Sequence, residues 1–299
     1  MNKYNHRFYI GPHSPLSVPM GRVIKRNADQ LLENKTECPP SRPNREILSD
    51  ILKLPEHNLT DWNTHQIYVD SLLSKDATRD LIYNYDAFLG SRKNAFNADT
   101  VYPSMEQKVG PLRLFTMAHK VTVFLCLQHY TDLIEFELKG LPELQTKIAS
   151  NPANPQFSWQ PFVSRLQSAW PEAQFMIIDA SQLAMHWAAI VALFTGHPKA
   201  HLFKGINDFS LASIDEFGRK YFEEALLASP PKSIGDWLKI SSKAFLQYGH
   251  YEPEVDTDGE NVWTLQQLQY SRRCFAADIM ALRKLKGVLI ASDLIADFK

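Results

Sequence analysis

Cysteine is scarce in this sequence. The 299 residues include three cysteines, Cys38, Cys126 and Cys274, and no two of them are close in the chain. This number and spacing argue against a disulfide framework and against a cysteine-based zinc site, and they favour a reducing compartment. We therefore expect a cytoplasmic protein.

The sequence also has neither a large excess of positive or negative charge nor a long apolar run. The formal net charge is −1 with 22% charged residues, which argues against a nucleic-acid partner. The longest apolar runs, VTVFLCL and AAIVALF, are too short to span a bilayer. The amino-terminal residues lack the apolar segment of a signal peptide. We expect neither nucleic-acid binding nor a membrane span.

Hydrophobic side chains make up 44% of the chain, and their pattern alternates between strands and helices. We predict strands near residues 7–10, 81–85, 121–127 and 174–178. The almost continuously apolar run from Val121 to Leu127 is typical of a strand buried on both faces of a parallel sheet. The pattern predicts one α/β domain over residues 1–299, with a mainly parallel central sheet flanked by helices and a helix-rich last third. The ending GVLIASDLIA predicts a final strand, or a strand and a short helix.

Helix boundaries follow from apolar spacing and from proline. Apolar residues from Met20 to Leu32 recur at helical spacing. The proline-rich stretch CPPSRPNRE predicts a loop, and Asn44 or Ser49 would cap the helix that follows it.

The stretch FYIGPHSPLSVPMGR has the outline of a strand, a phosphate-cradling loop and a helix. In parallel α/β sheets, ligands bind beyond the carboxyl ends of the strands. A helix amino terminus there offers free N–H groups and a partial positive charge. We expect Ser17 to cap this helix and Pro19 to lie in its first turn.

The order of several segments along the chain resembles a known family. IGPH begins the series, followed by YNYDAFLG, TVYPSMEQKVGPLRLF, VTVFLCLQHYTDLIEFE, FSWQPFVSRLQSAWPEAQF and LQYSRRCFAADIMALRKLKGV. In this order they are similar to the motifs of the bacterial sulfotransferase-like proteins of the P-loop fold. Members transfer a sulfuryl group from 3′-phosphoadenosine 5′-phosphosulfate to an acceptor hydroxyl, so the resemblance implies that donor and a carbohydrate or other small hydroxylated acceptor.

The chain departs from the family at the positions that hold the donor. Ser14 stands where the family has its loop lysine, Gln128 where it has the arginine for the 3′-phosphate, and Phe136 where it has a serine. Charge-assisted hydrogen bonds contribute about 1.5–3 kcal/mol each. Losing both cations therefore costs about 3–6 kcal/mol, or two to four decades of affinity. Pro15 and Pro19 also remove two N–H donors. We expect weak or absent donor binding.

Some site chemistry survives by this alignment. Asp86 occupies a carboxylate position and would act as base toward the acceptor hydroxyl, and His13 would supply positive charge when protonated. The residues that would contact the donor are Gly11, Pro12, Ser14, Ser17, Arg22 and Gln128. Arg92 and Lys93 would face an anion from a neighbouring loop. A purely structural interpretation also exists for five of these side chains. Asp86 would cap a turn, and His13, Arg22, Arg92 and Lys93 would be solvated surface groups.

Other polar residues have structural interpretations. The spacing of His186, His197 and His201 fits no metal-ligand pattern, so we expect no metal. Asp278 would pair with Arg272 or cap a contact. The sequence contains no GxSxG, GxGxxG, HExxH or Walker GxxxxGK[ST] motif.

Two functional hypotheses follow, and both stay open at this level. One is a diverged sulfotransferase with a degenerate donor site. The other is a non-catalytic binding protein that uses the same cleft for a glycan or a protein partner. A third interpretation limits the resemblance to general P-loop architecture. Burial of Leu16 in the mouth of the loop would favour the binding protein, because no anion could then enter.

Overall fold

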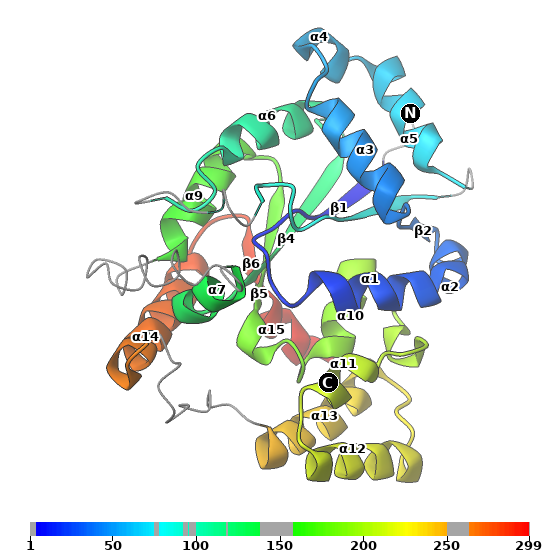
Figure 1. Ribbon diagram of the computed structural model, residues 1–299. Coiled ribbons are helices and arrows are strands. Elements are labelled where there is room, and N and C mark those ends of the chain that lie inside the picture. The colour runs from blue at the N-terminus through cyan, green and yellow to red at the C-terminus, as the bar shows by residue number, and fades with distance from the viewer. Residues whose placement is uncertain are drawn as a thin grey trace.

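The computed structural model describes residues 4–74, 78–91, 95, 100–117, 119–137, 158–249 and 263–298. Within them, six strands form one sheet in the order β2-β3-β1-β4-β5-β6, and each neighbouring pair is parallel. The predicted α/β class with a parallel central sheet is therefore confirmed (Figure 1). The strands are β1 (Asn5–Tyr9), β2 (Thr36–Glu37), β3 (Asp80–Asn84), β4 (Lys120–Leu127), β5 (Gln174–Asp179) and β6 (Val288–Ile290).

The chain first builds the sheet on one side of β1 and then on the other. β2 and β3 extend it in one direction, and β4, β5 and β6 extend it in the opposite direction. The strand order thus reverses next to β1, and such a switch point is where α/β sheets place their ligands. The run Val121–Leu127 lies in β4, between β1 and β5, with Val123 to Leu127 almost completely buried. The predicted central strand is confirmed.

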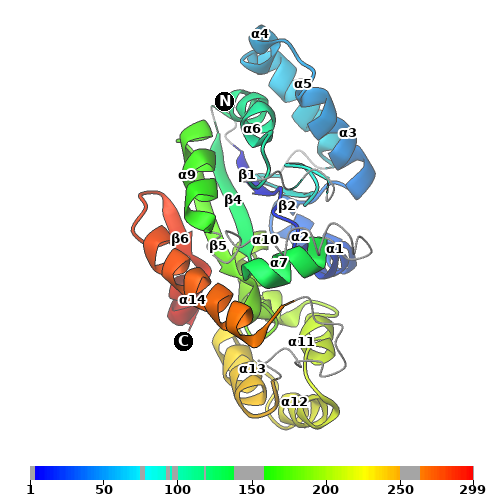
Figure 2. The ribbon, with the colours of Figure 1, turned by 60° about the vertical axis from the view of Figure 1, so that its left-hand side comes forward.

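Helices cover both faces of the sheet. Those of at least four residues are α1 (Ser17–Arg26), α2 (Ala28–Glu33), α3 (Ser41–Ile51), α4 (Glu56–Leu59), α5 (Trp62–Leu72), α6 (Met105–Phe115), α7 (Tyr130–Glu137), α9 (Trp159–Ala169), α10 (Trp187–Thr195), α11 (Asp208–Ala212), α12 (Glu216–Ala228), α13 (Ile234–Tyr248), α14 (Leu265–Leu282) and α15 (Ala291–Ile295). In both views α3, α4 and α5 lie together at one end of the molecule, and α11, α12 and α13 lie together at the other (Figures 1 and 2).

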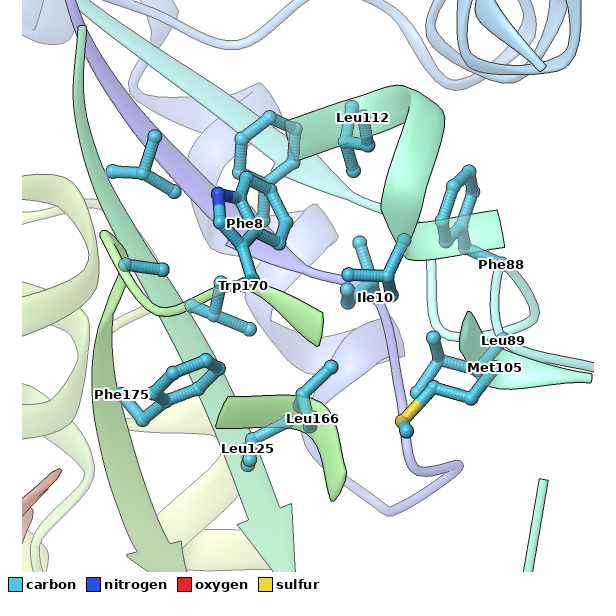
Figure 3. Close-up of a cluster of buried hydrophobic side chains, with 14 of the residues drawn as sticks. Phe8, Ile10, Phe88, Leu89, Met105, Leu112, Leu125, Leu166, Trp170 and Phe175 are labelled. Carbon is cyan, nitrogen blue, oxygen red and sulfur yellow. The ribbon is translucent and has the colours of Figure 1, made fainter. Parts of the chain in front are cut away.

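Two apolar clusters, one for each face, hold these helices on the sheet. Phe8, Leu125 and Phe175 point from the strands into the first cluster, where Trp170 and Leu112 pack on them (Figure 3). Side chains of α1, α10, α13 and α15 fill the second cluster. Successive residues of β1 point to opposite faces of the sheet. Phe8 belongs to the first cluster and Tyr9 to the second, as expected for a strand with both faces covered.

Two local predictions were wrong, and one short strand was missed. The proline-rich stretch is helical from Ser41, because Pro43 lies in the first turn of α3, where a missing N–H costs nothing. The helix expected over 20–32 is broken at Asn27 into α1 and α2. There the Asn27 side chain donates to the carbonyls of Val23 and Lys204 and accepts from the Lys204 N–H. The two-residue strand β2 was not anticipated.

The last third is helical as predicted, in α12, α13 and α14, and the ending forms β6 followed by α15. No helix in the described part of the chain has the length and apolarity that a membrane crossing requires.

Candidate functional site

The loop between β1 and α1 lies at the carboxyl end of a central strand, where the sequence predicted it. Gly11 begins the loop with a φ of +125°, a backbone conformation that residues with a Cβ atom rarely adopt. A Cβ atom at Gly11 would lie 3.0 Å from the backbone oxygen of Asp86. The glycine therefore lets the loop pack directly against the turn that follows β3.

Ser14 is buried inside this loop, and its hydroxyl is saturated. The Tyr9 hydroxyl lies 2.7 Å from the Pro12 carbonyl oxygen and 2.6 Å from the Ser14 Oγ. A carbonyl only accepts, so Tyr9 donates to Pro12 and Ser14 donates to Tyr9. The Ser14 Oγ in turn accepts from the Leu16 N–H at 3.2 Å. The position that would carry a lysine in the family is thus turned inward.

The surroundings of Ser14 favour neutral groups. Burial raises the pKa of Tyr9 well above its ordinary value, and the nearby Cys126 and Asp86 raise this pKa further. Burial likewise raises the pKa of the Cys126 thiol to about 12, although a hydrogen bond with Ser14 opposes the rise. Both groups are neutral at pH 7. A charged ligand or a lysine ammonium would enter a site with little compensation for its lost hydration.

His13 is buried rather than solvated, and Tyr102 holds it. The His13 N–H donates to the Tyr102 hydroxyl at 2.9 Å, and the His13 Nδ1 lies 3.0 Å from the same oxygen. Tyr102 has a positive φ of 51°, which is uncommon for a bulky residue and has an energetic cost. The structure thus accepts backbone strain at the residue that fixes the loop histidine.

The buried side chain of Gln128 is also hydrogen-bonded to the loop backbone. Its side-chain N–H₂ donates to the His13 carbonyl oxygen at 3.2 Å, and the Gln128 backbone carbonyl accepts from the Trp159 indole at 2.8 Å. Gln128 is 5% exposed. The position aligned with the 3′-phosphate arginine therefore binds the loop backbone. The side chain of Phe136, aligned with the family's serine, lies outside the described residues.

Leu16 is completely buried and packs in the cluster between α1 and the sheet. Leu16 also takes the N-cap position of α1, without a side-chain hydrogen bond, so the expectation that Ser17 caps this helix was wrong. Ser17 is instead hydrogen-bonded to Asn84, at the carboxyl end of β3. The Ser17 Oγ donates to the Asn84 Oδ1 at 3.3 Å, and the Asn84 N–H₂ donates to the Ser17 carbonyl at 2.9 Å. Pro19 lies in the first turn of α1, as predicted.

The predicted residues that remain are Asp86, Arg22, Arg92 and Lys93. Asp86 is half-buried in the turn after β3 and close enough to Tyr9 to affect the pKa of that phenol. Arg22 lies exposed on α1. Arg92 and Lys93 lie outside the described residues. The structure therefore brings Gly11, Pro12, His13, Ser14 and Gln128 together with Asp86 at their margin, while Arg22 faces solvent.

Asp278 has a structural role. Its carboxylate accepts from the Ser158 hydroxyl and, at 2.6 Å, from the Trp159 N–H, so it satisfies the amino terminus of α9. Burial raises the pKa of this carboxyl, and the hydrogen bonds from Ser158 and Trp159 oppose the rise. Capping was one of the two predicted roles for this residue.

A group that sequence reasoning missed lies at the other end of the sheet. His6, His65 and His119 are the one set of three or more metal-ligating side chains that come together in the described part of the chain. More than fifty positions separate each histidine from the next, so no local motif could have revealed them. His186, His197 and His201, which the sequence analysis had considered, form no such set among the described residues.

Two open hollows lie over α6, away from the loop. One, of about 450 Å³, is lined by residues of α4 and α6 and by Leu54, and the other, of about 580 Å³, by residues of α6 and α9. None of the predicted site residues lines either hollow.

Comparisons of the chain with protein-family models, with curated proteins and with solved structures found no match.

Proposed function

We propose that this protein is a non-catalytic binding protein that keeps a sulfotransferase-like α/β framework without a working donor site. The observation that carries the proposal is the inward closure of the loop after β1. Ser14 bonds to Tyr9, His13 bonds to Tyr102, and Leu16 is 0% exposed. The groups that would receive the phosphosulfate are instead part of the protein interior.

The hydrogen bonding inside the loop supports this proposal energetically. The N–H groups of His13 and Leu16 already donate to side-chain oxygens, and prolines at 12, 15 and 19 supply no N–H at all. An anion would have to break these bonds, each worth about 1 kcal/mol net, and no cation aligned with the family would repay the loss. The ligand of the binding protein would be a glycan or a protein partner at the carboxyl edge of the sheet.

Calorimetry with 3′-phosphoadenosine 5′-phosphate tests the proposal. We expect no saturable heat and no rise in the melting temperature at ligand concentrations up to about 1 mM, a ceiling that corresponds to about −4 kcal/mol of binding free energy. Saturable one-to-one binding with a micromolar or smaller Kd would overturn it.

A second candidate is a diverged sulfotransferase acting on a carbohydrate or other hydroxylated acceptor. The partly exposed carboxylate of Asp86, beside the loop, favours it. In that reaction the acceptor hydroxyl attacks sulfur, the bond from sulfur to the bridging oxygen breaks, and Asp86 takes the hydroxyl proton.

Release of 3′-phosphoadenosine 5′-phosphate from the donor, in the presence of a panel of glycans, distinguishes the two candidates. The binding protein releases none above the rate without protein. The enzyme releases it in a manner that Asp86→Asn abolishes, whereas the matched change Asp29→Asn, at an exposed position of α2, leaves the rate unchanged.

A further inference from the structure

Three histidines meet near the amino end of the sheet. His6 comes from β1, His65 from α5, and His119 from the residue just before β4. One ring nitrogen of each lies within 4.8 Å of one ring nitrogen of both others. His6 and His65 are 0% and 3% exposed, and His119 is half-buried. The cluster thus joins the central strand, its neighbour in the sheet and a covering helix.

Two of the rings stack on each other, and the third meets both of them edge-on. His65 stacks on His119 with ring centroids 4.2 Å apart, and His6 meets His119 edge-on at 5.1 Å. Trp62 stacks on the His65 ring, and Phe115 packs against the same ring at a tilt. No carboxylate belongs to the set of grouped side chains. Any ligand between the rings would therefore meet imidazole nitrogens.

Several of these nitrogens have no hydrogen-bond partner in the described structure. They are the Nε2 of His6 and both ring nitrogens of His65. A buried polar atom without a partner costs about 1–3 kcal/mol, and native proteins satisfy nearly all of them. Unsatisfied nitrogens on two neighbouring buried rings of one imidazole cluster point to a ligand that accepts lone pairs.

His6 and His65 are buried, and burial favours the neutral imidazole that a metal ion needs as a ligand. Burial lowers the pKa of His65 to about 3, and the neighbouring His119 contributes to the same shift. Burial also lowers the pKa of His6 well below its ordinary value, with His119 and His65 contributing. At pH 7 both rings carry an available lone pair.

Two hydrogen bonds around the cluster set which nitrogen faces it. The His6 Nδ1 pairs with the Tyr83 hydroxyl at 3.2 Å, which leaves its Nε2 for a ligand, an arrangement common around bound metals. The His119 Nδ1 accepts from the Tyr4 N–H at 3.1 Å, so without a ligand its proton sits on Nε2. Coordination through Nε2 would move that proton to Nδ1 and break the Tyr4 bond, which lowers the affinity of the site.

We propose that His6, His65 and His119 bind one divalent transition-metal ion, Zn²⁺ or a metal of similar ligand preference. Neutral imidazoles suit zinc, copper, nickel and cobalt, whereas magnesium and calcium prefer oxygen ligands. Metal–nitrogen bonds of about 2.0–2.1 Å place tetrahedral ligand atoms about 3.4 Å apart, so the rings close inward by about 1 Å on binding. The stacked rings of His65 and His119 must also rotate, because their in-plane lone pairs have to converge on the ion. The fourth position is left for a water molecule.

The site would act as a structural clamp. It ties β1 to α5 and to the start of β4, at the opposite end of β1 from the loop that begins at Gly11. Because binding requires the folded arrangement of three distant segments, the metal stabilises the native state, and the stabilisation grows with the logarithm of the free metal concentration above the Kd. Failure of the proposed function would leave this inference untouched, since the two sites share no residue.

Titration of the chelator-treated full chain with Co²⁺ and Zn²⁺ tests the inference. We expect one equivalent of Co²⁺ to produce the intense visible absorption of a four-coordinate ion and Zn²⁺ to displace it. Zn²⁺ should also raise the melting temperature in a concentration-dependent way. His65→Phe, which keeps an aromatic ring between Trp62 and Phe115, should weaken Zn²⁺ binding on the order of a hundredfold. The control His57→Gln, at an exposed position of α4, should bind as the parent does.

A second measurement covers the case in which His65→Phe fails to fold, as judged by circular dichroism. In the parent chain, the nitrogen NMR signals of the His119 ring should move from the Nε2–H to the Nδ1–H tautomer on addition of Zn²⁺. Absence of one-to-one binding in the parent, or full binding in a folded His65→Phe variant, would overturn the inference. An unchanged His119 tautomer at saturating Zn²⁺ would do so as well.

Discussion

Ser14 shows how a single side chain closes the loop. Ser14→Ala removes the partner of the Leu16 N–H and one donor to Tyr9, so the free energy of unfolding should fall by about 1–2 kcal/mol. Ser14→Lys places an ammonium beside the buried Tyr9 and Cys126, and the loss should exceed about 3 kcal/mol. Urea unfolding measures both losses.

Ser17→Ala is the matched control for this series. Its hydroxyl is half-buried and makes one long bond, to Asn84 at 3.3 Å, so the expected loss is about 0.5 kcal/mol or less. If Ser14→Lys proves as stable as the parent, the lysine must reach solvent, and the loop can open in the way that donor binding requires.

Among the elements, α6 contains an unusual pair, Gly110 followed by Pro111. Pro111 lies in the helix interior and cannot make the bond from position 111 to the Gln107 carbonyl. Pro111→Ala should therefore raise the free energy of unfolding by about 1–3 kcal/mol. Gly110→Ala alone should bring little gain, because proline disfavours helical backbone in a preceding residue that carries a Cβ.

The double variant of α6 provides the internal check. With Pro111 replaced, Gly110→Ala should add about 0.5–1 kcal/mol, since a Cβ at Gly110 meets nothing within 4 Å. The two changes are thus expected to be non-additive in urea unfolding. Simple additivity would show that the helix bends around Pro111 without loss.

The elements also show what the sequence could predict. A continuous apolar run identified β4, because only a central parallel strand needs apolar side chains on both faces. The start of α3 was missed, because proline reads as a helix breaker unless the first turn is already located. The loop after β1 was located correctly, but the inward direction of Ser14 and Leu16 depends on Tyr9 and on α10, which sequence spacing does not reveal.

The histidine cluster marks the limit of this reasoning. His6, His65 and His119 meet only because β1 pairs with β4 and α5 packs over them. A pattern search along the chain compares near neighbours, so it considered His186, His197 and His201 and rejected them on their spacing. Among the described residues, those three indeed form no group of ligands.

For the molecule as a whole, His186, His197 and His201 predict one part of how stability depends on pH. Burial is the main cause that lowers the pKa of His186, His197 and His201 below its ordinary value. The unfolded chain therefore binds more protons below about pH 6.5, and the free energy of unfolding should fall as the pH falls, by at most about 1.4 kcal/mol per pH unit for each group.

Urea unfolding between about pH 7.5 and pH 5.5 measures this dependence. The variant with all three histidines changed to glutamine should lose less stability over that interval than the parent does. Equal losses in the parent and the variant would show that these histidines titrate alike in the folded and unfolded states.

The central position of β1 has a consequence for synthesis on the ribosome. β1 emerges before β3 and β4, the two strands that flank it, so its apolar residues stay uncovered until the chain has grown past Leu127. No hairpin can form early, because parallel strands need long crossovers. Nascent chains arrested before residue 120 should be fully digested by protease, and resistance should begin only after β4 and its helices have emerged. Of the strands described here, the one that emerges first would thus be among the last to find its place, and the growing chain would depend on chaperones in the interval.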